Sequence, residues 1–176
     1  MSIIFLGGVY GVGKSTLGSK LSEKTGWPFY SAGDLISSVN GEKYGANKYV
    51  SNKVANQEIL VECVAGLLQS YENLFLGGHF CILNRQGQIE QLPLDVYERL
   101  CISEIVLLEA SKEILLRNLK KRDDRHYSSQ LIQELIAFER ETAGIVARNI
   151  QRSLFIHEMT YSDADVDTII NHTNTK

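Results

Sequence analysis

The sequence predicts an α/β fold in which helices cover both faces of a parallel β-sheet. Short apolar runs, typical of buried strands, alternate along the chain with longer spans of helix-like apolar spacing. This alternation favours βαβ units and therefore a parallel sheet. A glycine-rich loop directly after the first apolar run indicates the same fold class. No internal repeat or linker divides the 176 residues, so we expect a single domain over residues 1–176.

The glycine-rich loop, residues 8–16, fits the phosphate-binding pattern G-x-x-x-x-G-K-[ST]. The apolar run at 2–7 precedes it, and a helix-like span from Thr16 to Lys24 follows, which is the context that this pattern requires. Its backbone N–H groups and the helix N-terminus would converge on an anion. We therefore expect a bound nucleotide, contacted by Gly8, Gly11, Val12, Gly13, Lys14, Ser15 and Thr16.

Two of these side chains have predicted chemical roles. The Lys14 ammonium group is expected to reach the β- and γ-phosphates of the nucleotide. The Ser15 hydroxyl is the predicted ligand of Mg²⁺.

Between this loop and residue 79 we expect two strands and two helices. The expected elements are a strand at 29–31, a helix from about 33, a polar loop at 40–47, a helix within 50–71 and a strand at 74–76. Asp34 opens the first of these helices and either positions an acceptor or caps the helix. His79 follows the strand and two glycines, and it either binds phosphate, acts as a general base or hydrogen-bonds a loop carbonyl.

In the second half the chain is expected to form a hairpin and then alternating helices and strands. The expected elements are a hairpin at about 80–92, a helix at 94–100, a strand at 104–108, a helix from Ser111 to about 121, a helix from Ser128 or Ser129 to about 152, a strand at 154–159 and a helix from Asp163 to about 170. The longest helix has Leu131, Leu135 and Phe138 along one side.

The strongly charged segment at 120–127 has two interpretations. Arg122 and Arg125 could close on the γ-phosphate as part of a lid, or the segment could be a solvated turn between two helices. Arg117, Arg140 and Arg148, on the flanking helices, could likewise face the nucleotide or form surface salt bridges.

Composition excludes several classes of partner. The net charge of -3 and the lack of a basic aromatic groove argue against nucleic acid as a ligand. No apolar run approaches the length needed to cross a membrane. The three cysteines are far apart and form no Cys/His cluster, so we expect neither a disulfide framework nor a metal cluster, and we expect a cytoplasmic protein.

Five stretches, at 8–16, 30–35, 74–79, 92–93 and 105–117, together give the chain a resemblance to a known family. In this order the chain resembles the adenylate kinase-like nucleotide kinases, and in particular the compact archaeal-type adenylate kinases. The resemblance implies a P-loop NTPase three-layer αβα fold with a five-stranded parallel sheet, a helical acceptor arm at about 37–71 and a short lid at about 121–127. It also implies Mg·ATP as the phosphate donor, with Arg122 on the donor phosphates and Arg125 as a second lid arginine.

The chain departs from that family at two places. The third strand of the family usually ends in an aspartate that helps to hold Mg²⁺ through water, and here that position is Gly77. Magnesium would then rest on Ser15, the phosphates and water, with Asp34 or Glu109 as further ligands. The acceptor arm contains no arginine, and its cations are Lys43, Lys48 and Lys53.

The leading functional hypothesis is a phosphotransferase that moves the ATP γ-phosphate to a small acceptor such as a nucleotide or nucleoside. Its expected catalytic residues are Lys14, Arg122, Arg125 and Asp34. The alternative is an ATP-binding and ATP-hydrolysing switch or assembly factor that acts through a protein partner. A kinase of RNA or DNA ends fits the acidic composition poorly.

Overall fold

A computed structural model of the protein describes residues 1–41, 53–84, 86–123 and 127–173. Five strands form one parallel sheet in the order β2-β3-β1-β6-β7, which confirms the predicted fold class. These strands are β1 (Ser2–Gly7), β2 (Phe29–Ser31), β3 (Asn73–Gly77), β6 (Ile102–Glu109) and β7 (Leu154–Glu158). A separate antiparallel hairpin is formed by β4 (Cys81–Leu83) and β5 (Ile89–Gln91).

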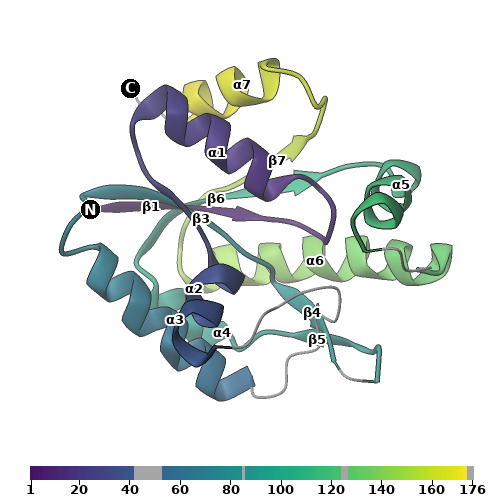
Figure 1. Ribbon diagram of the computed structural model, residues 1–176, viewed down its shortest axis with the longest axis horizontal. Coiled ribbons are helices and arrows are strands. Elements are labelled where there is room, and N and C mark those ends of the chain that lie inside the picture. The colour runs from purple at the N-terminus through teal and green to yellow at the C-terminus, as the bar shows by residue number, and fades with distance from the viewer. Residues whose placement is uncertain (42–52, 85, 124–126, 174–176) are drawn as a thin grey trace.

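Helices cover both faces of the sheet (Figure 1). The helices are α1 (Lys14–Thr25), α2 (Ala32–Asn40), α3 (Lys53–Leu67), α4 (Leu94–Arg99), α5 (Lys112–Asp123), α6 (Ser129–Asn149) and α7 (Ala164–Thr173). Helices α1 and α7 lie on one face, and α3, α4 and α6 lie on the other.

Two hydrophobic cores follow from the alternation of side chains along the strands. In β1, Ile3 and Phe5 pack in the core shared with α3, α4 and α6. Their neighbours Ile4 and Leu6 pack in the opposite core, which includes Leu17 of α1 and residues of α7. The sheet is therefore buried on both sides. Because its strands are parallel, the loops at their carboxyl ends gather at one edge of the sheet.

The buried face of α6 does not follow apolar character alone. Of the three apolar side chains expected along one side of this helix, Leu135 is buried, Leu131 is partly buried and Phe138 is 49% exposed. The buried stripe instead follows Ile132, Leu135, Glu139 and Thr142, at alternating helical steps of three and four residues. Phe138 is therefore exposed although it is apolar, and the helix geometry brings the polar Glu139 into the interior.

Among the described residues, no helix combines the length and apolar character needed to span a membrane.

A buried aspartate fixes the connection between β7 and α7. Asp165 is 1% exposed, and its Oδ1 accepts hydrogen bonds from the backbone N–H (2.9 Å) and the hydroxyl (2.8 Å) of Thr160. The same oxygen lies 2.9 Å from Nε2 of His157. Burial alone would raise the pKa of this carboxyl, but the hydrogen bonds from Thr160 and His157 outweigh it and hold the pKa below its ordinary value.

We expect Asp165→Asn to lower the free energy of unfolding by about 1–3 kcal/mol at pH 7. A carboxylate whose pKa is lowered by folding stabilises the protein above its unfolded pKa of about 4, and this stability is lost as the pH falls through the folded-state pKa. The difference between the variant and the parent should therefore shrink below about pH 4. Urea denaturation at several pH values between about 3 and 7 measures this difference in the free energy of unfolding. Asp167→Asn, at an exposed position of the same helix, serves as the control, and its free energy of unfolding should change little. A loss of stability in Asp165→Asn that does not depend on pH would contradict the charge argument.

Candidate active site

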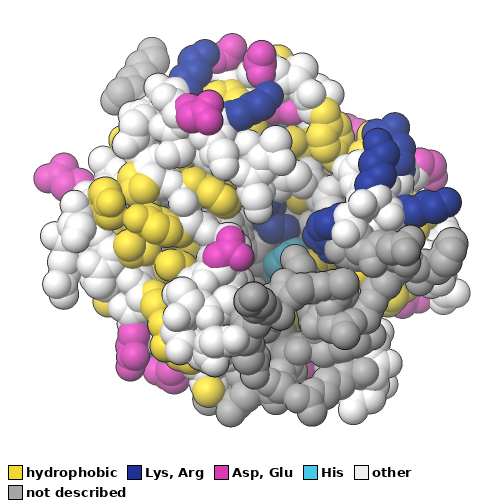
Figure 2. All heavy atoms as spheres, viewed as in Figure 1, with side chains coloured by type: hydrophobic (Ala, Val, Ile, Leu, Met, Phe, Trp, Pro, Cys, Tyr) yellow, Lys and Arg dark blue, Asp and Glu magenta, His cyan; other side chains and the backbone are white. Residues whose placement is uncertain are grey.

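A cavity of about 570 Å³ opens at the edge of the sheet where β1, β2 and β3 end. The phosphate loop lines it, together with residues of α2, α3, α4, α5 and the β7–α7 connection. Figure 2 shows a hollow on this face in which a histidine side chain is visible, with Lys and Arg side chains beside it. The predicted position of the ligand at the carboxyl ends of the strands therefore coincides with this cavity.

The backbone of the phosphate loop suits an anion. At Gly8 the φ angle is 145°, and a Cβ atom there would lie 2.6 Å from the carbonyl oxygen of Leu108, so the loop needs glycine at this point. Gly13, at φ 103°, is the N-cap of α1 and provides no side-chain hydrogen bond to the first turn. That turn also contains no acidic residue. Its N–H groups and the partial positive charge of the helix end can thus serve a phosphate.

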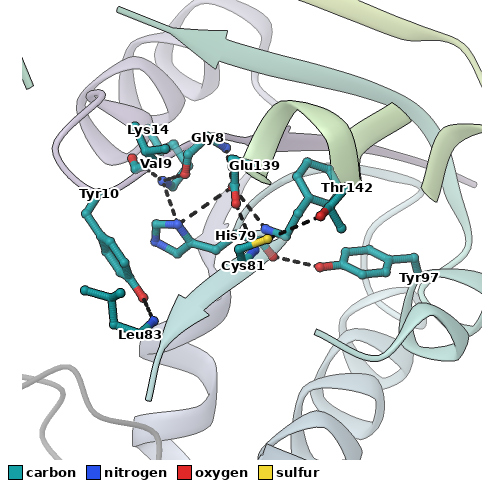
Figure 3. A network of polar contacts seen from close by, with 11 residues as sticks. Gly8, Val9, Tyr10, Lys14, His79, Cys81, Leu83, Tyr97, Glu139 and Thr142 are labelled. Carbon is teal, nitrogen blue, oxygen red and sulfur yellow. Dashed lines mark hydrogen bonds and ion pairs between the residues drawn. The ribbon is translucent and has the colours of Figure 1, made fainter. Parts of the chain in front are cut away.

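The Lys14 side chain lies across this loop. Its Nζ donates hydrogen bonds to the carbonyl oxygens of Gly8 and Val9, the second at 3.1 Å. It also lies 3.5 Å from Nδ1 of His79 (Figure 3). The ammonium group is therefore held against the loop that is predicted to bind phosphate.

The backbone of the site is held by Glu139, a residue that the sequence did not indicate. Its side chain is 2% exposed. Oε1 accepts hydrogen bonds from the backbone N–H groups of Gly8 (3.1 Å) and Phe80 (3.0 Å), and Oε2 accepts one from Cys81 (2.8 Å). Burial raises the pKa of Glu139, while the charge of Lys14 and these three hydrogen bonds oppose the rise. One carboxyl from α6 thus joins the phosphate loop to the segment that follows β3.

His79 lies between these two charged groups. Its Nδ1 is 3.9 Å from Oε1 of Glu139, and its ring centroid is 4.2 Å from that of Tyr10 in the phosphate loop. The backbone oxygen of His79 accepts a 2.7 Å hydrogen bond from the Tyr97 hydroxyl. The side chain lines the cavity, and its exposed fraction is 19%. The ring is therefore fixed on one side and open to the cavity on the other.

Only some of the other predicted nucleotide contacts lie at the surface of the cavity. Ser15 and Thr16, in the first turn of α1, line the cavity, as do Gly11 and Gly13. The buried Val12 and Gly8 lie behind this surface, where only their backbone can contribute.

The two predicted lid arginines also differ. Arg122 lies in the last turn of α5 and lines the cavity, one helical turn after Asn118, whose Nδ2 donates a 2.9 Å hydrogen bond to the carbonyl oxygen of Gly11. Arg125 lies outside the described residues, so its role stays a prediction.

Asp34 is not brought to the cavity. Its side chain is exposed on the first turn of α2, and its backbone N–H donates to the hydroxyl of Ser31, which is the cap of this helix. Ser31 and Gly33 line the cavity, but Asp34 does not. The acceptor role of Asp34 therefore stays a prediction without support from this geometry.

The remaining predicted cations and Glu109 also lie elsewhere. Arg140 forms a 3.1 Å ion pair with Glu109, which shows the surface salt bridge that was one of its two expected roles. Arg117 and Arg148 are exposed and do not line the cavity. The side chains of the arm lysines, Lys43, Lys48 and Lys53, are outside the described part of the structure.

The structure gives a packing reason for glycine at position 77. Gly77 lines the cavity, and a Cβ atom there would lie 2.9 Å from the ring of Phe29. The same ring would also meet a Cβ at Gly18 of α1, at 2.2 Å. Phe29 therefore occupies the space that an aspartate at the end of β3 would need.

The described residues contain no group of three His, Cys, Asp or Glu side chains placed to hold a metal ion. Ser15 offers a hydroxyl oxygen, a ligand type that suits Mg²⁺, beside the predicted phosphates. The residues present thus fit an ion that is carried mainly by the phosphates and water.

Solved structures with this fold include small-molecule kinases. A shikimate kinase from Bacteroides thetaiotaomicron is 16% identical, with a TM-score of 0.66 and 98% of each chain covered. A shikimate kinase from Acinetobacter baumannii in complex with shikimate is 16% identical, with a TM-score of 0.64 and coverage of 100% of this chain and 95% of that one. A gluconokinase from Sinorhizobium meliloti 1021 is 17% identical, with a TM-score of 0.59 and coverage of 98% and 95%. At these identities the likeness shows the fold.

No curated protein sequence matches the chain. A family model described as "AAA domain" matches residues 7–136, which include the phosphate loop, the hairpin, α5 and the start of α6. These findings support a P-loop kinase-like domain, and the narrower resemblance to adenylate kinases is not confirmed. Because the match extends over most of its length, the chain belongs to this AAA-domain family.

Proposed function

We propose that the protein is an ATP-dependent phosphotransferase that moves the γ-phosphate to a hydroxyl group of a small acceptor. The reaction breaks the bond between the γ-phosphorus and the bridging oxygen, which leaves with ADP, and forms a bond from phosphorus to the acceptor oxygen. The proton of the acceptor hydroxyl passes to a base or to water. Such a reaction depends on positioning the two reactants and on neutralising the phosphate charge.

One observation carries this proposal: a single cavity has two kinds of lining. The phosphate loop and α5 provide the first, which we call the donor compartment, and apolar residues of α2, α3, α4 and the hairpin provide the second, the acceptor compartment. A nucleotide switch needs only the first compartment. A phosphotransferase needs a second one that holds the acceptor next to the γ-phosphate and keeps water away.

The donor compartment supplies the groups that phosphate transfer requires. Lys14 and the N–H groups of the loop would neutralise the β- and γ-phosphates, and Arg122 would approach the transferring group from α5. Ser15 would help to hold Mg²⁺, which neutralises phosphate charge when it is bound. Arg125 would act beside Arg122, as the sequence predicts.

His79 is the proposed proton acceptor. Its ring lines the cavity, and its Nδ1 lies 3.5 Å from Nζ of Lys14, which would contact the transferring phosphate. The contact of its backbone oxygen with Tyr97 and the packing of its ring on Tyr10 fix its orientation. A positioned histidine contributes typically 10²–10⁴-fold as a general acid or base.

The proposal is tested by mixing the protein with Mg·ATP and single acceptors, and by following ADP and phosphorylated product by chromatography. The acceptors are ribo- and deoxyribonucleosides, their monophosphates, shikimate, gluconate and simple sugars. We expect one class to give product in a one-to-one ratio with ADP. Release of inorganic phosphate alone, unaffected by every acceptor, would overturn the proposal and would favour an ATP-dependent switch that acts through a protein partner.

A further inference from the structure

The acceptor compartment contains one buried polar group that the protein itself leaves without a partner. Gln57, on α3, is 6% exposed and lines the cavity. Its Oε1 is buried and has no hydrogen-bond partner among the described residues. Since buried polar atoms in proteins are almost always hydrogen-bonded, an exception at a cavity wall indicates that a ligand completes the bond.

The wall around this amide is apolar. Ile36 of α2, Leu60 of α3, Ile82 of β4, and Val96 and Tyr97 of α4 line the same cavity, and Asn56 beside Gln57 bonds to Asn40 across α2 and α3. A ligand that fits here has flat or apolar faces and a polar edge. A polyol would instead bury several hydroxyl groups against hydrocarbon, which is unfavourable.

The described positive charges that line the cavity belong to other helices than Gln57. Among the described residues, the cations that line it are Lys14 and Lys20 of α1, and Lys121 and Arg122 of α5. They lie on α1 and α5, whereas the described residues of α2, α3 and α4 that line the cavity are all uncharged. A sugar acid or a nucleoside monophosphate would bring its own anion to this uncharged lining, so a neutral acceptor suits it best.

The geometry points to an uncharged nucleoside as the acceptor, with the edge of its base hydrogen-bonded to the Gln57 amide and a sugar hydroxyl directed towards His79 and Lys14. The unpartnered Oε1 of Gln57 can accept a hydrogen bond from an N–H group on the edge of a base. Apolar side chains that sandwich a base while a polar group reads its edge are a common solution for extruded nucleotides. This inference rests on the proposed phosphotransferase function and names its substrate class.

The test uses Gln57→Met, which keeps the size of the side chain and removes the amide. Because the unpartnered oxygen disappears, the free variant should melt about 2–4 °C higher than the parent. Nucleoside binding, measured by calorimetry without ATP, should weaken about tenfold or more. Gln69→Met, at an exposed position just after α3, is the matched control and should change neither quantity. If Gln57→Met is more stable than the parent but binds nucleoside more weakly, the Gln57 amide serves ligand binding and not folding.

Other outcomes separate this inference from the proposed function. Phosphorylation of gluconate, shikimate or a nucleoside monophosphate, but of no nucleoside, would overturn the inference and leave the phosphotransferase standing. Nucleoside binding that Gln57→Met does not weaken would overturn the role of the amide. Nucleoside binding without transfer to any acceptor would support the site and overturn the function.

Discussion

Replacing Lys14 by alanine is expected to lower kcat/KM for phosphate transfer by at least roughly 100-fold. The Lys14 ammonium group donates hydrogen bonds to the carbonyl oxygens of Gly8 and Val9 in the phosphate loop and lies 3.5 Å from Nδ1 of His79. On nucleotide binding it can exchange these carbonyl oxygens for phosphate oxygens, which carry full negative charge. Initial rates of product formation measure the loss, and calorimetry with ATP shows how much of it comes from binding.

Lys24→Ala is the matched control because Lys24 lies on the same helix, α1. It is exposed, forms a 2.7 Å ion pair with Asp167 and does not line the cavity. Exposed pairs of this kind contribute little, so its rate should stay within about twofold of the parent. A Lys14→Ala variant that kept the parental rate and ATP affinity would remove Lys14 from the phosphates.

The proposed donor side could be described from the sequence because its groups are close together in the chain. A phosphate loop uses the backbone of consecutive residues, so the pattern from Gly8 to Thr16 carries nearly the whole cradle. His79 could also be found, because it follows a strand and the carboxyl ends of parallel strands meet at one edge. The alternation of strands and helices sufficed for the sheet and its two covered faces.

The acceptor side depends on contacts that the sequence does not record. Gln57 reaches the cavity because α2, α3 and α4 pack around it, and no local pattern distinguishes it from an ordinary polar residue of a helix. Asp34 has a stronger local signal, at the first turn of a helix, yet its side chain turns to solvent. Glu139 is the extreme case, because its three hydrogen-bond donors are 58 to 131 residues away in the chain.

Glu139→Ala is expected to lower the free energy of unfolding by about 3–5 kcal/mol. The change would leave the backbone N–H groups of Gly8, Phe80 and Cys81 buried without their acceptor, and each such loss costs about 1–3 kcal/mol. Urea denaturation at neutral pH measures the effect. Glu141→Ala, at an exposed position of the same helix, should cost under about 0.5 kcal/mol. Equal losses for the two variants would contradict the structural role of Glu139.

A double-mutant cycle can separate the charge of Glu139 from its hydrogen bonds. The charge of Lys14 opposes the rise that burial causes in the pKa of Glu139, so the two groups should stabilise each other. Lys14→Met and Glu139→Gln both keep the approximate size of the side chain. The double variant should lose less free energy of unfolding than the two single variants lose together, by roughly 0.5–3 kcal/mol. Additive losses would mean that Lys14 serves the nucleotide alone. A coupling of this size would mean that Glu139 of α6 and Lys14 stabilise each other, so that α6 helps to hold the lysine at the phosphate loop before the nucleotide binds.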